Sequence, residues 1–409
     1  MKKGIGATVI SIVILAVVAV GLYFWAYYPR EENQQEGQQT EAAGADGKSA
    51  EGENARGSAE GEGGQLLDDS QLPGENQDGQ AEGAEDQQTD AAQSEETEPE
   101  EVTLVFTGDI FLSSYVLNNY DSAGIHGVVS DYLLEEMRTG DITVANEEFP
   151  FSTRGEQAPD KQFTFRVDPS YVTALTDMGI DLVTLANNHA LDYGIQALTD
   201  TFDTLDAAGI AYIGAGADKE RAEEPWIFQA GQKKFGFLGA SRVIPEVSWN
   251  IENQQPGMLC TYDSKSLCEA IRTTKQQCDF VTVYVHWGIE RENTPQEYQR
   301  QLAKEYIDAG ADLVIGAHPH VLQGIEYYNG KPIVYSLGNY IFNQEIASTV
   351  LIKAVVTPEN EITLQLLPAF SSGAKTQEMS EEKAAELYRF MEEISYEVTI
   401  GADGVVQAD

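Results

Sequence analysis

From about residue 101 onward the chain alternates short apolar runs with stretches of helical periodicity, and this alternation limits its fold more than any other feature. The runs lie at residues 103–107, 142–145, 182–185, 211–213, 235–238, 280–285, 313–315, 333–336 and 350–356. Helical patterns at 128–138, 170–178, 195–208, 264–273 and 296–309 separate many of them. Nearly all-apolar strands alternating with helices are typical of a sheet that helices cover. The sequence therefore predicts an α/β fold.

The later runs follow one another with fewer helices between them, which predicts a second, partly antiparallel sheet. A helical pattern at 381–394 and a hairpin around 401–404 end the chain, and we expect both to pack on the outside of the domain. We assign residues 101–375 to the main domain and residues 376–409 to this C-terminal piece.

Residues 1–30 have the pattern of a membrane anchor. Lys2 and Lys3 precede an uncharged apolar stretch at 5–28, long enough to cross a bilayer as a helix, and aromatic residues gather at its far end. The two lysines favour a cytoplasmic N-terminus, so we expect a single-pass protein of the cell membrane with an extracellular domain. A cleaved signal peptide is the alternative, but no small-residue cleavage site precedes the aromatic cluster.

Residues 31–100 carry roughly twenty acids and only two basic residues, Lys48 and Arg56, with almost no large apolar side chains. Such a segment cannot bury enough apolar surface to fold, so we expect a disordered acidic linker. The whole chain has a formal net charge of −42, and a little under half of it falls in this linker. The charge argues against nucleic acid as a partner, and a polyanion would bind only through cations.

Polar residues follow several of the apolar runs, and four of the five histidines are among them. In α/β sheets, ligands bind in the crevice beyond the carboxyl ends of the strands. Imidazole, carboxylate and amide oxygen are ligands of divalent metals. The sequence therefore predicts a metal site formed by strand-end residues drawn from Asp109, Asn146, Glu148, Asn188, His189, His286, His318 and His320.

Further roles follow from local spacing. His189 is placed to donate a proton to a leaving group, and Asp192 to orient its ring. In an extended tripeptide His318 and His320 would share a face, so we expect both imidazoles to converge on one site. His126, in a glycine-rich loop, has no evident partner and is expected at the surface. The three cysteines lack metal-type spacing, and we expect thiols without a catalytic role.

Six motifs follow one another along most of residues 101–345: GDI at 108–110, NEEFP at 146–150, NNHALDYG at 187–194, VHWGIE at 285–290, HPHVLQGIE at 318–326 and SLGNYIF at 336–342. In this order they resemble the motifs of the capsule-synthesis proteins of the CapA type, the poly-γ-glutamate biosynthesis family, whose members have a calcineurin-like metallophosphatase fold. The resemblance implies a two-sheet sandwich flanked by helices, with the site on the rim where the sheets meet.

The same resemblance implies a ligand set for one or two divalent ions, Mn, Zn or Fe, made of Asp109, Glu148, Asn188, His286, His318 and His320. Phe111 stands where the metallophosphatase pattern has a histidine, so the first metal position has lost a ligand and a full two-metal centre is in question. Asn146 would contact the substrate, bind metal or orient a neighbour. Asn339 would line the site or cap a turn.

Two functions are consistent with these observations. The first is a membrane-anchored metal-dependent hydrolase outside the cell, acting on a phosphate ester or a γ-glutamyl amide, with His189 and Asp192 as catalytic residues. The second is a non-catalytic component of capsule synthesis or export, whose metal site binds the anionic polymer poly-γ-glutamate beside the synthase subunits. Fold likeness alone does not decide between them.

Overall fold

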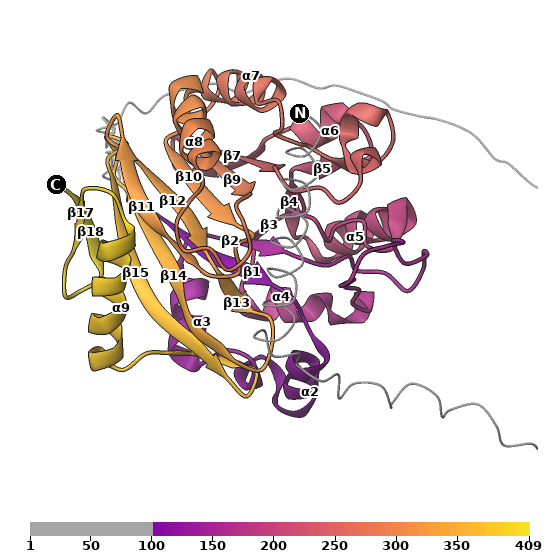
Figure 1. Ribbon diagram of the computed structural model, residues 1–409, viewed down its shortest axis with the longest axis horizontal. Coiled ribbons are helices and arrows are strands. Elements are labelled where there is room, and N and C mark those ends of the chain that lie inside the picture. The colour runs from indigo at the N-terminus through magenta and orange to yellow at the C-terminus, as the bar shows by residue number, and fades with distance from the viewer. Residues whose placement is uncertain (1–100) are drawn as a thin grey trace, which may run out of the picture. The chain divides into compact units, whose positions relative to one another are not determined.

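Two β-sheets face each other in the computed structural model, which describes residues 101–409, and helices cover the outer faces of the sheets (Figure 1). Among these residues no helix has both the length and the apolar character needed to span a bilayer. The anchor and linker expected at residues 1–100 lie outside the described part of the chain.

The first sheet has ten strands and is parallel only in part. Strands β1, β2, β3 and β4 run parallel, whereas β14, β15, β18 and β17 continue the sheet beyond β1 with antiparallel pairing. In spatial order the strands are β17 (Val398–Ile400), β18 (Val405–Ala408), β15 (Ile362–Ser372), β14 (Ile346–Val356), β1 (Val102–Ile110), β2 (Ile142–Glu147), β3 (Leu182–Thr184) and β4 (Ala211–Ile213), with β13 (Asn339–Ile341) on β1 and β16 (Lys375–Glu378) on β15.

The second sheet has six strands, and its four central ones are parallel. One antiparallel strand flanks each side, which confirms the expected second, partly antiparallel sheet. The spatial order is β11 (Leu322–Tyr328), β12 (Lys331–Leu337), β10 (Leu313–Ala317), β9 (Phe280–His286), β7 (Lys233–Ser241) and β6 (Trp226–Ala230), and a separate small pair joins β5 (Ala215–Gly216) to β8 (Gly257–Met258).

The helices divide between the two outer faces according to which core their apolar residues enter. Over the first sheet lie α2 (Ser114–Ala123), α3 (Asp131–Thr139), α4 (Thr173–Met178) and α5 (Gly194–Ala208). Over the second sheet lie α6 (Lys219–Glu223), α7 (Lys265–Lys275) and α8 (Glu297–Ala309). Short 3-10 turns are η1 (Gly124–Gly127), η2 (Pro169–Val172), η3 (Val247–Trp249) and η4 (Ile251–Asn253).

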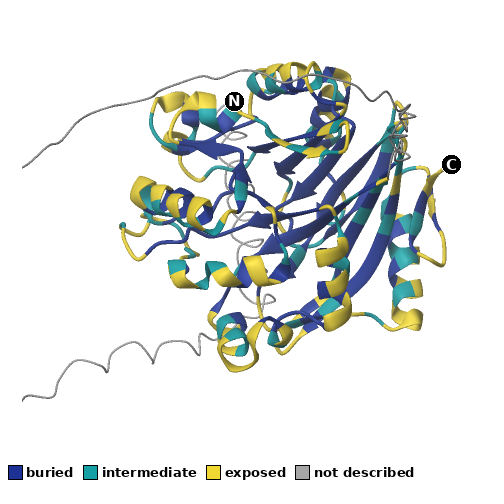
Figure 2. Ribbon diagram, turned by 180° about the vertical axis from the view of Figure 1, so that it is seen from behind, coloured by how far each residue is buried: buried dark blue, intermediate teal, exposed yellow. Residues whose placement is uncertain are grey.

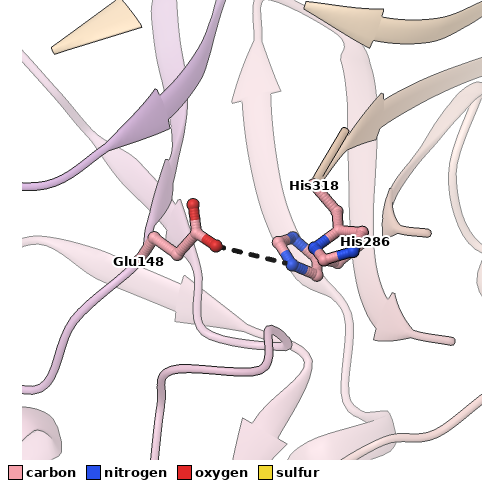
Figure 3. A group of neighbouring side chains, drawn as sticks. All are labelled: Glu148, His286 and His318. Carbon is pink, nitrogen blue, oxygen red and sulfur yellow. Dashed lines mark ion pairs between the residues drawn. The ribbon is translucent and has the colours of Figure 1, made fainter. Parts of the chain in front are cut away.

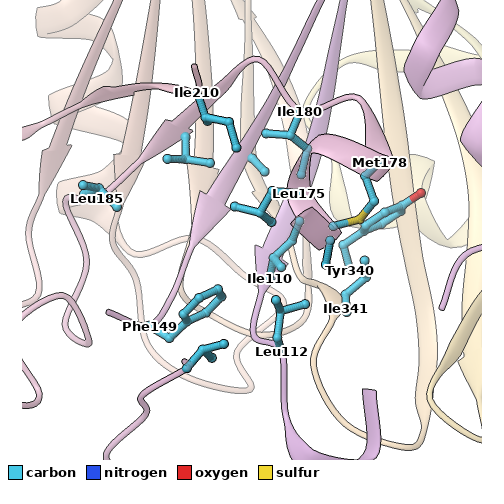
Figure 4. Close-up of a cluster of buried hydrophobic side chains, with 14 of the residues drawn as sticks. Ile110, Leu112, Phe149, Leu175, Met178, Ile180, Leu185, Ile210, Tyr340 and Ile341 are labelled. Carbon is cyan, nitrogen blue, oxygen red and sulfur yellow. The ribbon is translucent and has the colours of Figure 1, made fainter. Parts of the chain in front are cut away.

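Three apolar cores hold these layers together, and strand alternation supplies them. Successive side chains of a strand point to opposite faces of the sheet. In β1, Val105 therefore packs with the helices over the first sheet, whereas Leu104 and Phe106 enter the core between the sheets. Leu175 and Met178 of α4 belong to the same helix-side core as Val105 (Figure 4). In β9, Val283 faces the second helical layer and Tyr284 the inter-sheet core. Because both faces are covered, the central strands are buried along nearly their whole length (Figure 2).

The C-terminal piece takes part in the sandwich, contrary to our expectation that it would pack on the outside. Strand β18 pairs with β15 and so extends the first sheet. Helix α9 (Glu381–Ile394) places Leu387 and Met391 in the inter-sheet core. The physical reason is that the sandwich leaves apolar surface open at this edge, which α9 and Val406 of the hairpin cover.

Glu326, the last residue of the HPHVLQGIE motif, connects strand β11 to helix α8. Its carboxylate accepts two hydrogen bonds from Arg300, at 2.9 and 3.0 Å, and one from the Tyr335 hydroxyl at 2.8 Å. The Lys304 ammonium lies 3.0 Å away. Burial raises the pKa of Glu326, but these donors outweigh it and lower the pKa to about 2. The ionised carboxylate is therefore part of the folded structure.

We expect Glu326→Gln to lower the free energy of unfolding at pH 7 by about 3 kcal/mol, the lower end for breaking a buried pair, because the basic partners stay partly exposed. Since folding depresses this pKa, the stabilisation is present above about pH 4.5 and is lost as the pH falls towards 2. Urea unfolding at pH 7 and pH 3 measures both effects. Substitution of the exposed Glu361 by Gln is the control, and an equal loss at both pH values would contradict the assignment.

Candidate metal centre

The strand-end residues meet at one edge of the sandwich because the parallel strands of both sheets end there. Asp109 is the last residue but one of β1, and Glu148 directly follows β2. His286 is the last residue of β9, and His318 directly follows β10. Asn188 lies four residues beyond β3. The carboxyl edge is the position that the sequence predicted for the site.

Close approach of two chain segments explains the glycine before Asp109. A glycine before an aspartate is often part of a turn, but Gly108 lies inside β1. A β-carbon at Gly108 would lie 1.8 Å from the carbonyl oxygen of Gly338. The Asp109 N–H donates to that same oxygen at 2.9 Å. Glycine is therefore needed because the segment before β13 packs directly on β1, and this contact fixes the position of Asp109.

His318 and His320 do not form the extended tripeptide that we expected. Their φ angles are 97° and 59°, a region that residues other than glycine enter rarely and at a cost. The turn separates the two rings, whose centroids are 5.8 Å apart, and directs them to different neighbours. The expected extended backbone was therefore wrong, but both imidazoles still reach the same cluster, since the two groups that contain them share Glu148.

Two groups of side chains that could hold a metal ion overlap at Glu148. One consists of Glu148, His286 and His318 (Figure 3), and the other of Asp109, Glu148 and His320, with the ligand atoms of each group within 4.8 Å of one another. Glu148 Oε1 lies 3.7 Å from His286 Nε2, and Glu148 Oε2 lies 3.9 Å from His320 Nδ1. A carboxylate shared by two such groups is the arrangement that lets two cations lie side by side.

The buried polar atoms of this cluster fit a cation. Asp109 Oδ2, both carboxylate oxygens of Glu148 and Nδ1 of His318 are buried and lack a hydrogen-bond partner in the described residues. Leaving such atoms unpaired is costly unless a ligand satisfies them. Burial, then the nearby Asp109, raises the pKa of Glu148 well above its usual range. A metal ion would supply the missing partner for all four atoms.

The histidine pKa values show where the cluster favours positive charge. Burial lowers the pKa of His320, but the carboxylates of Glu148 and Asp109 outweigh this and raise it to about 10. Burial first, then the neighbouring imidazoles, lower the pKa of His318 to about 3 and that of His286 well below 6.5. Neutral His286 and His318 are ready to bind metal, whereas at His320 a proton takes the place that a cation would occupy.

Two asparagines orient the ligands. Asn146 is fully buried, donates from Nδ2 to Asp109 Oδ1 at 2.8 Å and accepts at Oδ1 from Asn187 at 3.1 Å. Because Asn146 is not exposed, a substrate could not contact it, and its position fits the role of orienting Asp109. Asn188 Oδ1 lies 2.7 Å from His286 Nε2, which places the amide oxygen beside the first group of ligands. Asn339 is partly exposed, and its Oδ1 lies 2.8 Å from His320 Nδ1, so it lines the centre.

His189 lies beside the centre and belongs to neither ligand group. Its Nδ1 is 2.6 Å from Asp192 Oδ2, so Nδ1 donates to the carboxylate and leaves Nε2 directed inward, 3.9 Å from Glu148 Oε1. Both His189 and Asp192 are buried. Burial lowers the pKa of His189, although Asp192 opposes this. The expected His189–Asp192 pair is therefore present.

Three aromatic rings and one lysine complete the surroundings. Phe165 stacks on His189 with ring centroids 4.1 Å apart, and Phe111 stacks on the other face of Phe165 at 4.0 Å. Phe342 packs at 5.2 Å from His320. Lys161 reaches the carboxylate of Asp192. Reasoning from the sequence missed Lys161 and Phe165 because they lie in a loop that follows no apolar run, so a search for strand ends could not find them.

The remaining histidine and the cysteines lie outside the cluster. His126 is exposed as expected, but it has a partner, since its Nδ1 lies 2.6 Å from Asp131 Oδ1. The three cysteines are buried free thiols. Burial raises the pKa of Cys260 to about 12, which makes it unreactive.

The chain is an α/β protein of two facing sheets, with a cluster of histidines and carboxylates at the carboxyl edge of its parallel strands. Residues 103–344 match the family described as "Bacterial capsule synthesis protein PGA_cap", and the chain belongs to that family. It is 35% identical over 243 residues to "PGA biosynthesis protein CapA" of Bacillus subtilis (58% of this chain, 63% of the relative). It is 32% identical over 269 residues to "Capsule biosynthesis protein CapA" of Bacillus anthracis (63% of this chain, 64% of the relative). The chain thus spans just under two thirds of these relatives' length.

Solved structures align with the chain more distantly. A hypothetical protein from Thermus thermophilus aligns with a TM-score of 0.43 and 16% identity, over 66% of this chain and 100% of that one. A putative 5'-nucleotidase from Staphylococcus aureus aligns with a TM-score of 0.41 and 13% identity, over 72% of this chain and 58% of that one.

Proposed function

We propose that this protein is a membrane-anchored, extracytoplasmic metal-dependent hydrolase that acts in capsule polymer synthesis or export. Membership of the capsule-synthesis family supports the biological setting. The overlap of two ligand groups at Glu148, with His189 beside them, is the observation that carries the chemical part. This combination provides both a cation site and a proton donor, as in metallophosphatase-like hydrolases.

Residues at the centre would have two roles, metal binding and proton transfer. Asp109, Glu148 and His320 would hold one divalent ion, and Glu148, His286 and His318, with the Asn188 amide, another. Such ions polarise a phosphoryl or carbonyl oxygen and make water more acidic. His189 would donate a proton to the leaving group from Nε2 when the ring is protonated on both nitrogens, while Asp192 accepts the hydrogen bond of Nδ1.

The substrate class follows from charge and family. The bond cleaved would be a phosphate ester or a γ-glutamyl amide. The polymer would be poly-γ-glutamate, because two relatives are named for PGA or capsule biosynthesis. The chain is strongly acidic, with a net charge of −42, so an anionic substrate would be repelled by most of the surface. The bound cations would therefore be needed for binding as well as for chemistry. The anchor at residues 5–28 and the linker at 31–100 would hold the domain outside the membrane near the synthase subunits.

Assays of the purified full-length protein test this proposal. The protein is supplied with Mn²⁺ or Zn²⁺ and given a generic phosphodiester or a γ-glutamyl amide. We expect turnover of one substrate that stops when a chelator removes the metal. A metal-loaded protein that cleaves neither substrate favours the alternative.

The alternative is a non-catalytic component in which the bound metal holds polymer carboxylates. Phe111 favours this reading, since it stands at a position where metallophosphatases have a ligand and packs against Phe165 instead. Binding of oligo-γ-glutamate that depends on metal, without any cleavage, would be its signature.

A further inference from the structure

The loop of residues 152–166, which we call the strap, crosses beside the centre between β2 and η2. Its ends are closed on each other, because the Ser152 N–H donates to the Val167 carbonyl at 2.9 Å and the Val167 N–H to that of Pro150 at 3.1 Å. The strap also contacts the segment that carries the Asn-Asn-His motif, since the Ala158 N–H donates to the Asp192 carbonyl at 2.7 Å. It is therefore a fixed loop.

A single ammonium group in the strap touches three residues of that segment. Lys161 Nζ contacts a carboxylate oxygen of Asp192 and the backbone carbonyl of Asn188, and lies 3.0 Å from His189 Nδ1. The lysine side chain is only 13% exposed, and Asp192 is fully buried. Residues 185–193 form neither helix nor strand, so no regular hydrogen-bond ladder holds these side chains in place.

The strap also holds the face of the His189 ring. The Phe165 N–H donates to Asp192 Oδ2 at 2.6 Å, and the Phe165 ring lies between the rings of Phe111 and His189. The Asp192 carboxylate therefore accepts hydrogen bonds from His189 Nδ1–H, from the Phe165 N–H and from the Lys161 ammonium. Removing the lysine leaves this buried carboxylate without its cationic partner, and such a group moves or is solvated.

We propose that Lys161 is a positioning residue that fixes Asn188 and, through Asp192, the ring of His189 at the metal centre. This role rests on the proposed function only in giving the positioned residues their task. Lys161 sets the Asn188 backbone, and so the direction of the amide oxygen beside His286. It also keeps Asp192 aligned with His189 Nδ1, so that Nε2 stays directed towards the centre.

The strap has other anchors, which provide a matched control. Arg154 pairs with Asp200, and Arg166 lies over the Tyr193 ring at 3.9 Å. Arg154→Met therefore removes one ion pair of the strap without touching the centre. Lys161→Met removes the contacts with Asn188, His189 and Asp192. Comparing the two variants separates positioning at the centre from general attachment of the strap.

The experiment uses full-length protein with 15N-labelled histidine, loaded with diamagnetic Zn²⁺. His189 ring signals are identified from their absence in His189→Ala, and Zn²⁺ affinity is measured by competition with a chelator. We expect Lys161→Met to broaden or shift the His189 Nδ1–H signal and to weaken Zn²⁺ binding about 10-fold, as loss of an outer-sphere partner does. Arg154→Met should match the wild type in both.

Unchanged His189 signals and Zn²⁺ affinity in Lys161→Met would overturn the proposal. Lys161→Gln, which keeps one donor without the charge, is measured beside it and carries the test if the methionine variant does not fold. Neither measurement needs turnover, so the result stands whether or not the protein proves to be a hydrolase.

Discussion

Glu148→Gln is expected to abolish stable metal binding at both ligand groups. The carboxylate belongs to both groups, and its two oxygens are buried without a hydrogen-bond partner among the described residues. Loss of a partner one shell further out costs 10- to 100-fold in metal affinity, so loss of this shared ligand should cost at least about 100-fold. Metal content per chain after gel filtration, and Zn²⁺ affinity by chelator competition, measure the effect.

The neighbouring Glu147 supplies a matched control. It is also fully buried, neither of its carboxylate oxygens has a hydrogen-bond partner within residues 101–409, and it belongs to neither ligand group. Burial raises its pKa well above the usual range, which favours the uncharged acid, and glutamine resembles that form in size and charge. Glu147→Gln should keep the metal. If both variants retain it equally, Glu148 is not a ligand and the centre as described does not exist.

The positions of the candidate ligands could be predicted because the sequence shows where the buried strands end. An apolar run marks a buried strand, its carboxyl end marks an edge, and parallel strands share that edge. Asp109, Glu148, His286 and His318 were found by this reasoning alone. The sequence did not predict which residues His318 and His320 would each lie beside, because this depends on the positive φ angles at both histidines. Sequence spacing does not reveal such turns.

Long-range contacts account for the other differences. Lys161 lies 31 residues before Asp192 in a loop without periodicity, so only the folded chain brings them together. Gly108 follows the pattern of a turn glycine, but the requirement comes from Gly338, far along the chain. The C-terminal hairpin joins the first sheet because β15 leaves an edge that β18 can pair with. Local patterns predict elements well, whereas these contacts depend on the packing of distant segments.

His189→Ala is expected to leave metal binding intact and to lower the hydrolytic rate about 100- to 10,000-fold, the range for loss of a general acid. The ring belongs to neither ligand group, but its Nε2 points inward while Asp192 holds Nδ1. Metal content, turnover and the amount of capsule made by cells carrying the variant are measured together. His126→Ala is the control, since His126 is exposed and lies outside both ligand groups.

The outcome decides between the two functions because metal content depends on the two ligand groups, whereas turnover would also depend on His189. Retained metal with lost turnover and lost capsule assigns His189 to the chemical step. Retained metal with normal capsule means that a proton donor is not needed, and the centre then serves to bind polymer carboxylates through its cations. Loss of metal in His189→Ala would contradict the geometry itself, since the ligand atoms within each group lie within 4.8 Å of one another without this ring.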